Sequence, residues 1–244
     1  MTLALVDNRI SDECERALMI RGFRVIRMPA SKNLPTPMAS HPDMLVFYHK
    51  GHLISTADYG EEAEYVFSDV RYDCDISMKF VGSMHGKKYP ADAIFNALVI
   101  GNKIFCKTDS IDPAVLEYAK SAGLLPIHVN QGYPACTVLA LSAEHAITAD
   151  RGMAAAMQKE GIKVTLIDDG DISLPPYEYG FIGGAAGAYG DKVYFLGNAR
   201  LHKSYPLIEK AIADAGMSAV FLAPTPLADL GRIIFIPEHS DNND

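Results

Sequence analysis

The chain has 244 residues, of which 49% are hydrophobic and 21% are charged, and its formal net charge is −8. This balance is typical of a globular protein that buries a sizeable core. The negative charge argues against a nucleic-acid partner or an anionic membrane surface, both of which need basic residues, but it would attract a cationic small molecule.

The first residues lack the basic start and long apolar run of a signal peptide, and no apolar stretch approaches the length of a membrane span. Four cysteines are scattered along the chain without a CxxC pair: Cys14, Cys74, Cys106 and Cys136. This spacing fits neither a disulfide framework nor a zinc site. We therefore expect reduced thiols in a cytoplasmic protein, with no membrane segment, no metal and no cofactor.

One pattern of elements recurs along the chain: two short apolar runs joined by a turn, a helix, and a third apolar run. Its copies lie, in chain order, at residues 2–29, 43–82, 96–130, 136–168, 190–224 and 231–237. The N-terminal copy lacks its first strand, and the C-terminal copy supplies only that strand. Joined, these two pieces complete a fifth unit.

Polar residues and glycines mark the ends of the predicted helices. An Asn or Asp follows the second strand of four copies, which favours capping and turns. These residues are Asn8, Asp109, Asp150 and Asn198. A glycine, which accepts a left-handed backbone, ends the helix in the same copies. These glycines are Gly22, Gly123, Gly161 and Gly216.

We therefore expect one α/β domain over residues 1–238, a closed five-unit ββαβ propeller whose last unit is split between the N- and C-termini. Closure would remove exposed sheet edges and make the two terminal strands neighbours. Residues 239–244 are expected to form a frayed tail. The alternative is an ordinary mixed α/β sheet, in which similar element orders also recur.

A ring of five ββαβ units resembles the pentein fold, the α/β propeller of the guanidino-group-modifying enzymes. Three stretches are similar to an uncharacterised bacterial family assigned to that fold: NQGYPAC (130–136), LPPYEYGFIGGAAG (174–187) and NARLH (198–202). The resemblance covers most of the chain from Met44 onward. It implies chemistry in which a cysteine attacks the guanidinium carbon, a histidine moves protons and carboxylates hold the cation.

The chain departs from this pattern in its last unit. The resemblance implies a nucleophilic cysteine at the start of the last first strand, where this sequence has Gly231. Cys136 occupies the analogous place in another unit. Aligning the apolar runs puts Asp43 and Asn96 in register with Cys136, and a Gly183–Gly184 run enters from the remaining unit.

The loops that follow the third strands are expected to gather at one end of the central channel, where a ligand site is usual. Cys136 is then the candidate nucleophile, with His128 first and His41 second as proton carrier; His85 and His202 compete for that role. Packing of Cys136 as an apolar side chain is the alternative.

The candidate substrate-binding residues lie in the same loops and strand starts. Asp43 and Asp92 would hold a flat cation by paired hydrogen bonds. The complete set is Asp43, Asp92, Asn96, Gln131, Tyr133, Phe181, Gly183, Gly184 and Asp229. The glycine run is not a dinucleotide loop, because a strand follows it where that motif needs a helix. It would instead let the backbone pass close to the channel or a ligand.

The leading hypothesis is a cysteine-dependent hydrolase or transferase that acts on a cationic guanidino or amidino small molecule. The alternative is a non-catalytic pentein-fold binding protein for a small molecule or a protein, which the missing last-unit cysteine would fit. The sequence names neither the substrate nor the oligomeric state.

Overall fold

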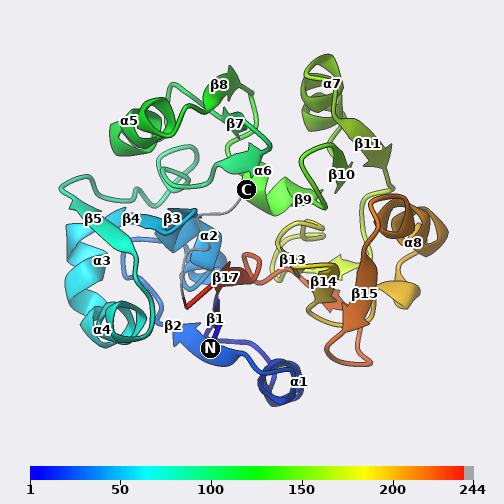
Figure 1. Cartoon of the computed structure of the whole chain (residues 1–244), viewed down its shortest axis with the longest axis horizontal. Helices are drawn as coiled ribbons and strands as arrows, with labels where there is room; N and C mark the ends of the chain where they lie inside the picture. Colours follow the sequence, from blue (N-terminus) through cyan, green and yellow to red (C-terminus); the bar gives the residue numbers. More distant parts are fainter. Residues whose placement is uncertain (239–244) are drawn as a thin grey trace.

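A sheet of three short strands recurs through the computed structural model, which describes residues 1–238 (Figure 1). In each of five such sheets the central strand pairs antiparallel on one side and parallel on the other. The central strands are β1 (Leu3–Asp7), β4 (His52–Thr56), β7 (Lys103–Cys106), β10 (His145–Thr148) and β14 (Lys192–Phe195).

The outer strands follow the same order in each sheet. The antiparallel partners are β17 (Ile234–Ile236), β3 (Val46–His49), β6 (Leu98–Ile100), β9 (Val138–Ala140) and β13 (Ala186–Tyr189). The parallel partners are β2 (Arg24–Met28), β5 (Ser77–Val81), β8 (Leu125–His128), β11 (Lys163–Leu166) and β15 (Ser218–Phe221). The pairing of β1 with β17 confirms that the two end strands are neighbours, as the sequence predicted.

Helices connect the parallel strands, since a parallel pair requires a crossover. They are α1 (Asp12–Ile20), α3 (Ala57–Glu62), α4 (Glu64–Asp73), α5 (Pro113–Ser121), α7 (Arg151–Lys159) and α8 (Tyr205–Asp214), the last preceded by the 3₁₀ turn η2 (Ala199–Leu201). In Figure 1 these helices lie at the periphery, while β13 contacts both β9 and β17 near the centre. The fold is thus mixed α/β with small sheets, and none of the described sheets closes into a barrel.

Two of the predicted helix caps lie elsewhere. The side chains that accept a hydrogen bond from the start of α1, α5, α7 and η2 are Ser11, Asp112, Asp150 and Asn198. Asn8 and Asp109 were predicted in place of Ser11 and Asp112, but the chain makes a turn after the strand before the helix begins. The cap therefore falls three residues later.

One helical turn precedes two of the first strands. These turns are α2 (Pro42–Leu45) and α6 (Pro134–Thr137). Cys136 lies two residues before β9, and Asn96 and Met44 lie two residues before β6 and β3. Asp43 is one residue further from its strand, so the predicted register was wrong by one at that unit. The helical turn hides this shift from an alignment that follows apolar runs.

The apolar core is divided among five clusters, each of which joins residues of one unit to residues of its neighbour. Cys14 and Cys106 are buried in two of these clusters, which confirms that they are packed thiols. Because each cluster is shared, a single unit could not bury its apolar face alone.

One further described sheet has only two strands. β12 (Ile172–Ser173) pairs with β16 (Leu227–Ala228), which ties together the loops that follow β11 and β15; η1 spans Thr36–Met38. Across residues 1–238, every helix is too short or too polar to traverse a bilayer.

Truncation of Phe67 tests the shared core. Phe67 is 0% exposed on α4 and stacks edge-on against Tyr59 and Phe80. Phe67→Ala should lower the free energy of unfolding by about 3–5 kcal/mol, because it leaves a cavity. Tyr72 on the same helix is 89% exposed, so Tyr72→Ala should change it by less than about 0.5 kcal/mol. Urea denaturation measures both; equal losses would contradict the assignment of the core.

Candidate active site

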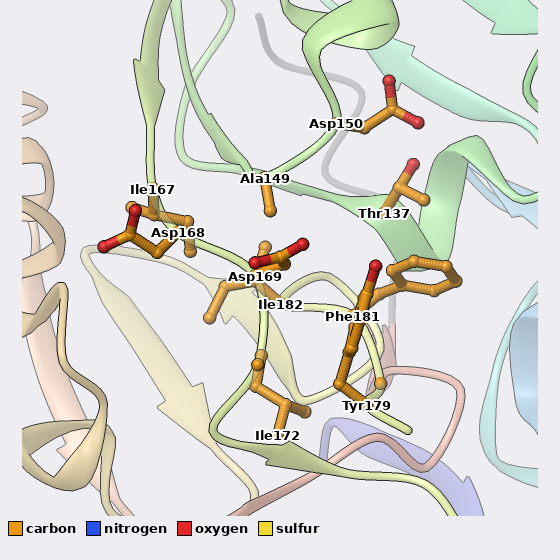
Figure 2. A pocket seen from close by; sticks show the side chains of 12 residues that line it. Thr137, Ala149, Asp150, Ile167, Asp168, Asp169, Ile172, Tyr179, Phe181 and Ile182 are labelled. Atoms are coloured by element: carbon orange, nitrogen blue, oxygen red, sulfur yellow. The ribbon is translucent and has the colours of Figure 1, made fainter. Parts of the chain in front are cut away.

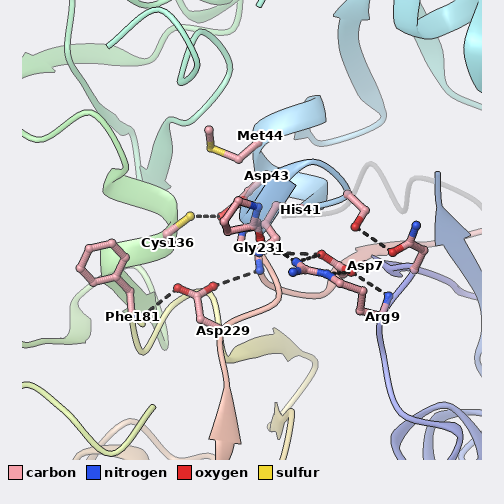
Figure 3. A network of polar contacts seen from close by, with 12 residues as sticks. Asp7, Arg9, His41, Asp43, Met44, Cys136, Phe181, Asp229 and Gly231 are labelled. Atoms are coloured by element: carbon pink, nitrogen blue, oxygen red, sulfur yellow. Dashed lines mark hydrogen bonds and ion pairs between the residues drawn. The ribbon is translucent and has the colours of Figure 1, made fainter. Parts of the chain in front are cut away.

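A cavity of about 380 Å³ opens beside α6 and the loop between β11 and β13. Its lining residues come from several units of the chain: Met38, His41, Tyr133, Cys136, Leu174, Tyr177, Glu178, Tyr179, Phe181 and Asp229. The titratable groups Cys136, His41 and Asp229 belong to a network of polar contacts that Figure 3 shows. Aromatic and aliphatic side chains make most of the remaining wall.

Cys136 is buried within hydrogen-bond reach of two polar side chains. Its Sγ donates to Oδ2 of Asp43 at 2.8 Å (Figure 3), and Nδ2 of Asn96 donates to Sγ at 3.2 Å. Burial raises the pKa of Cys136 well above its usual value, and the negative charges of Asp43 and Asp229 raise it further. The sulfur therefore rests as a thiol when no cation lies beside it.

Asp43 and Asn96 hold α2 against α6. The backbone N–H of Asp43 donates to the Gly231 carbonyl at 3.3 Å. Asn96 donates from Nδ2 to the Asp43 carbonyl at 3.3 Å and accepts at Oδ1 from the Ala135 N–H at 2.8 Å. Burial raises the pKa of Asp43 to about 6, although the Cys136 hydrogen bond and the charge of Arg232 oppose this. The carboxylate is thus a base with a pKa close to neutrality.

His41 is the histidine that lies beside Cys136. Its ring is buried, and Nε2 lies 3.7 Å from Oδ2 of Asp7, which is itself held by Arg9. Neither ring nitrogen has a hydrogen-bond partner among residues 1–238. Burial lowers the pKa of His41 to about 4, so its imidazole is neutral at pH 7.

One set of side chains could take a metal ion. His41, Asp43 and Cys136 each offer a ligand atom, and these atoms lie within 4.8 Å of one another. A thiolate, an imidazole and a carboxylate together suit a cation such as Zn²⁺. Two of these groups are already hydrogen-bonded, since the Cys136 thiol donates to Asp43, an arrangement that acid–base chemistry also uses.

Asp229 lines the same cavity as Cys136. Its Oδ2 accepts from the Phe181 N–H at 2.9 Å and its Oδ1 from the Gly231 N–H at 3.1 Å. Burial raises the pKa of Asp229 to about 7 in spite of these two bonds, and the charge of Asp43 adds to the rise. The charges of two buried carboxylates of raised pKa therefore act on Cys136, which makes the site receptive to a cation.

The glycines of the predicted site allow the backbone to approach these groups closely. A side-chain carbon at Gly184 would collide with the Asp229 carboxylate, and one at Gly183 would collide with backbone oxygens of α6. The Gly184 N–H donates to the Cys136 carbonyl at 2.9 Å. Gly231 has a left-handed backbone (φ 67°) and lies against His41, where a side chain would collide with the ring.

Asp92 and Gln131 stand behind the cavity wall rather than in it. The Tyr133 hydroxyl donates to Oδ2 of the buried Asp92 at 2.7 Å. Gln131 accepts from the Tyr133 N–H at 3.0 Å and donates to Asp150 at 2.7 Å. Both predicted residues thus touch Tyr133, which lines the cavity.

The other predicted histidines lie outside this cavity. His128 is exposed at the end of β8, bonds to Thr108 at 2.8 Å and lines a different cavity together with Gln131. The buried His85 contacts the Met44 carbonyl at 2.7 Å, and Nδ1 of the buried His202 accepts from the Ser204 N–H. Among the four candidates, only His41 shares the cavity with Cys136.

Sequence reasoning missed several residues of the site. Asp7 ends the first central strand and Arg9 follows it, at the polar junction that was assigned to capping. Arg232 is half-buried with a left-handed backbone (φ 60°), and it shares a second cavity of about 130 Å³ with Asp43. Tyr177 and Tyr179 were visible only as members of a long loop. Position within that loop was the one available signal.

Comparison with known proteins identifies the family of this chain and solved structures with the same fold. The model of a family of unknown function (DUF6873) matches residues 5–234, and no curated protein matches the sequence. A mutant dimethylarginine dimethylaminohydrolase of Pseudomonas aeruginosa, complexed with citrulline, superposes with a TM-score of 0.53 at 12% identity, over 90% of each chain.

Two further solved structures share the fold. For the agmatine deiminase of C. jejuni the TM-score is 0.52 at 9% identity, over 91% of this chain and 76% of that chain. For the inosamine-phosphate amidinotransferase of Streptomyces griseus it is 0.50 at 13% identity, over 89% and 76%. The chain therefore has the pentein fold, as the sequence resemblance implied, and it belongs to the DUF6873 family.

Proposed function

We propose that the chain is a cysteine-dependent hydrolase or transferase that acts on a guanidino or amidino small molecule, with Cys136 as the nucleophile. One observation carries this proposal: the Cys136 thiol, which donates to the buried Asp43, lines one cavity together with His41 and Asp229. These are the groups that attack on a guanidinium carbon requires. The hydrolases and the amidinotransferase of the same fold support it.

Binding a guanidinium would offset the negative charge at the cavity floor. Asp229 and Asp43 are buried acids of raised pKa, and a cation between them favours their ionised forms. Tyr133 and Phe181 supply aromatic faces on which a flat cation can stack. The same positive charge would lower the pKa of Cys136, so the thiolate forms when the substrate is in place.

The first half of the reaction forms a covalent adduct. The Cys136 proton moves to Oδ2 of Asp43, and Sγ attacks the guanidinium carbon to give a neutral tetrahedral adduct. The Asp43 proton then passes to the departing nitrogen, the C–N bond breaks and an amine leaves. What remains on Cys136 is a cationic thiouronium. The hydrogen bond already present between Cys136 and Asp43 supports this proton path.

The second half releases the product. Water gives a proton to His41 as its oxygen adds to the thiouronium carbon. The C–S bond breaks, the thiol regains a proton from the product, and a urea derivative departs. His41 passes its proton to the amine, so a guanidinium and water become a urea and an ammonium ion. In a transferase, a second amine takes the place of water.

His41 is the proton carrier in this proposal, in place of His128. His41 is neutral at pH 7 and shares the cavity with the thiol, whereas the exposed His128 lines another cavity. The alternative of a non-catalytic binding protein is not favoured, because Cys136 is surrounded by titratable groups rather than enclosed by apolar side chains alone.

The finer architecture is also part of the proposal. Residues 1–238 would form one domain in which the five sheets are units of a closed propeller, with the site at its centre. The pairing of β1 with β17 and the contacts of β13 with β9 and β17 support closure. The predicted tail, 239–244, lies outside the described residues. A nucleophilic thiol must stay reduced, so the proposal implies a reducing compartment such as the cytoplasm.

Replacing the nucleophile should abolish activity without unfolding the chain. Cys136→Ser should reduce turnover of guanidino compounds by at least about 10³-fold. Cys14→Ser, at a buried thiol outside the cavity, should leave turnover within about threefold if the variant folds, since Cys14 has no part in the chemistry.

Labelling gives a second measure of the same site. We expect 2-chloroacetamidine to modify Cys136 at least about tenfold faster than Cys14, as measured by mass spectrometry of digested protein, because the cation is drawn to the cavity carboxylates. Equal labelling of the two thiols, together with no turnover of any guanidino compound tested, would refute the proposal.

The pH profile should report the buried carboxylates. Their raised pKa values, about 6 for Asp43 and about 7 for Asp229, mean that both carry protons in acid and lose them toward neutrality. The value of kcat/KM should therefore rise with pH between about 6 and 7 and then level off until the thiol or the substrate titrates.

A variant of Asp229 tests which carboxylate causes the rise of kcat/KM near pH 7. Asp229→Asn should lower kcat/KM and remove the contribution near pH 7, while Asp191→Asn, on an exposed turn, should leave the profile unchanged. The same carboxylates bind more protons folded than unfolded, so their contribution to stability declines as pH rises from about 4 to 7. A value of kcat/KM that falls as pH rises from about 6 to 7 would contradict the assigned roles of the two carboxylates.

A further inference from the structure

The cavity beside Cys136 has charged groups of one sign. Its lining, all within the described residues, contains Glu178 and Asp229 but no lysine or arginine. Arg9, which follows β1, donates to both Asp7 and the Pro37 carbonyl and so is already engaged. Arg232 lines the separate cavity behind Asp43. A substrate carboxylate would therefore meet no cation in this cavity.

A smaller cavity of about 120 Å³ adjoins the first and shares Tyr179 and Phe181 with it. Figure 2 shows Tyr179 among the side chains that line this smaller cavity, with its hydroxyl on the same side as the carboxylates of Asp150 and Asp169. The negative charge of Asp169 raises the pKa of Tyr179, which agrees with their proximity. Asp150 is committed to Gln131 and to the start of α7, so Asp169 is the more available carboxylate.

The floor of the first cavity fixes which end of a ligand is held there. His41 is about 1% exposed, lines the cavity and has no hydrogen-bond partner on either ring nitrogen within residues 1–238. With Cys136 and Asp229 it would engage a guanidinium. The opposite end of the ligand would then point toward Glu178 at the mouth and toward Asp169 beyond Tyr179.

We propose that the substrate is a guanidino compound whose far end carries a second cationic group, such as an ammonium, in place of a carboxylate. The inference rests on the proposed function, since it assumes that the guanidinium lies beside Cys136. A second cation is attracted by Glu178 and Asp169, whereas a carboxylate is repelled by both and has no basic partner. The chain's net charge of −8 acts in the same direction.

Three probes of matched length test this without any need for turnover: (4-aminobutyl)guanidine, butylguanidine and 4-guanidinobutyrate. Each is measured by the concentration that half-protects Cys136 from alkylation by iodoacetamide, with Cys136→Ser as the blank. Glu178 and Asp169 are exposed, so each charge should change affinity by only about two- to fivefold. The aminobutyl compound should protect at the lowest concentration and the carboxylate at the highest, with the spread shrinking as salt is added.

Charge-removing variants assign the preference to these residues. Asp169→Asn combined with Glu178→Gln should make (4-aminobutyl)guanidine and butylguanidine equally protective while leaving the value for butylguanidine within about twofold. Asp191→Asn removes one negative charge from an exposed turn outside both cavities and should preserve the wild-type order.

The outcomes separate the two proposals. If the probes protect in the expected order but none is turned over, catalysis by Cys136 fails while the preference for a second cation stands. If 4-guanidinobutyrate protects as well as the aminobutyl compound, or the double variant keeps the preference, the inference is overturned and the proposed function survives. If no probe protects Cys136, both fail.

Discussion

Burial of carboxylates around one thiol is the constraint on which the rest of the site depends. Asp43 and Asp229 are withdrawn from water beside Cys136, and burial penalises their charge. Part of this cost is offset by two backbone N–H groups that donate to the Asp229 carboxylate and by the positive charge of Arg232 near Asp43. Neither acid is fully compensated, so its pKa stays above the usual value, and a cation beside either acid would favour the ionised form.

The repeated unit was readable from sequence because hairpin turns, helix stops and apolar runs are local signals. Their order sufficed to predict that β1 pairs with β17, although over 220 residues separate them along the chain. The position of Asp43 was not readable to one residue, because a helical turn and an extended strand can bury the same apolar side chains. Yet the carboxylate still reaches Cys136 from the shifted position.

The partner of Cys136 could not be read from sequence spacing. His128 is eight residues from Cys136, yet it points to solvent, while His41 is 95 residues away and lies beside the thiol. His128 ends β8, a strand whose residues are mostly exposed, whereas the packing of neighbouring units brings His41 to the thiol. Arg232 and Asp7 were not predicted as site residues for the same reason. Their interactions with Asp43 and His41 depend on how distant parts of the chain pack together.

The long segment between β11 and β13 supplies Leu174, Tyr177, Glu178, Tyr179 and Phe181 to the cavity wall, whereas Cys136, His41 and Asp43 come from other units. One segment therefore carries much of what a ligand's tail would touch, and it carries none of the groups that would act on the guanidinium carbon. Substitutions in this segment could exchange one tail for another while the reacting groups stay in place. Members of this family that act on different substrates would then differ mainly in the sequence of this one segment. A comparison of two members would begin with the residues of that segment.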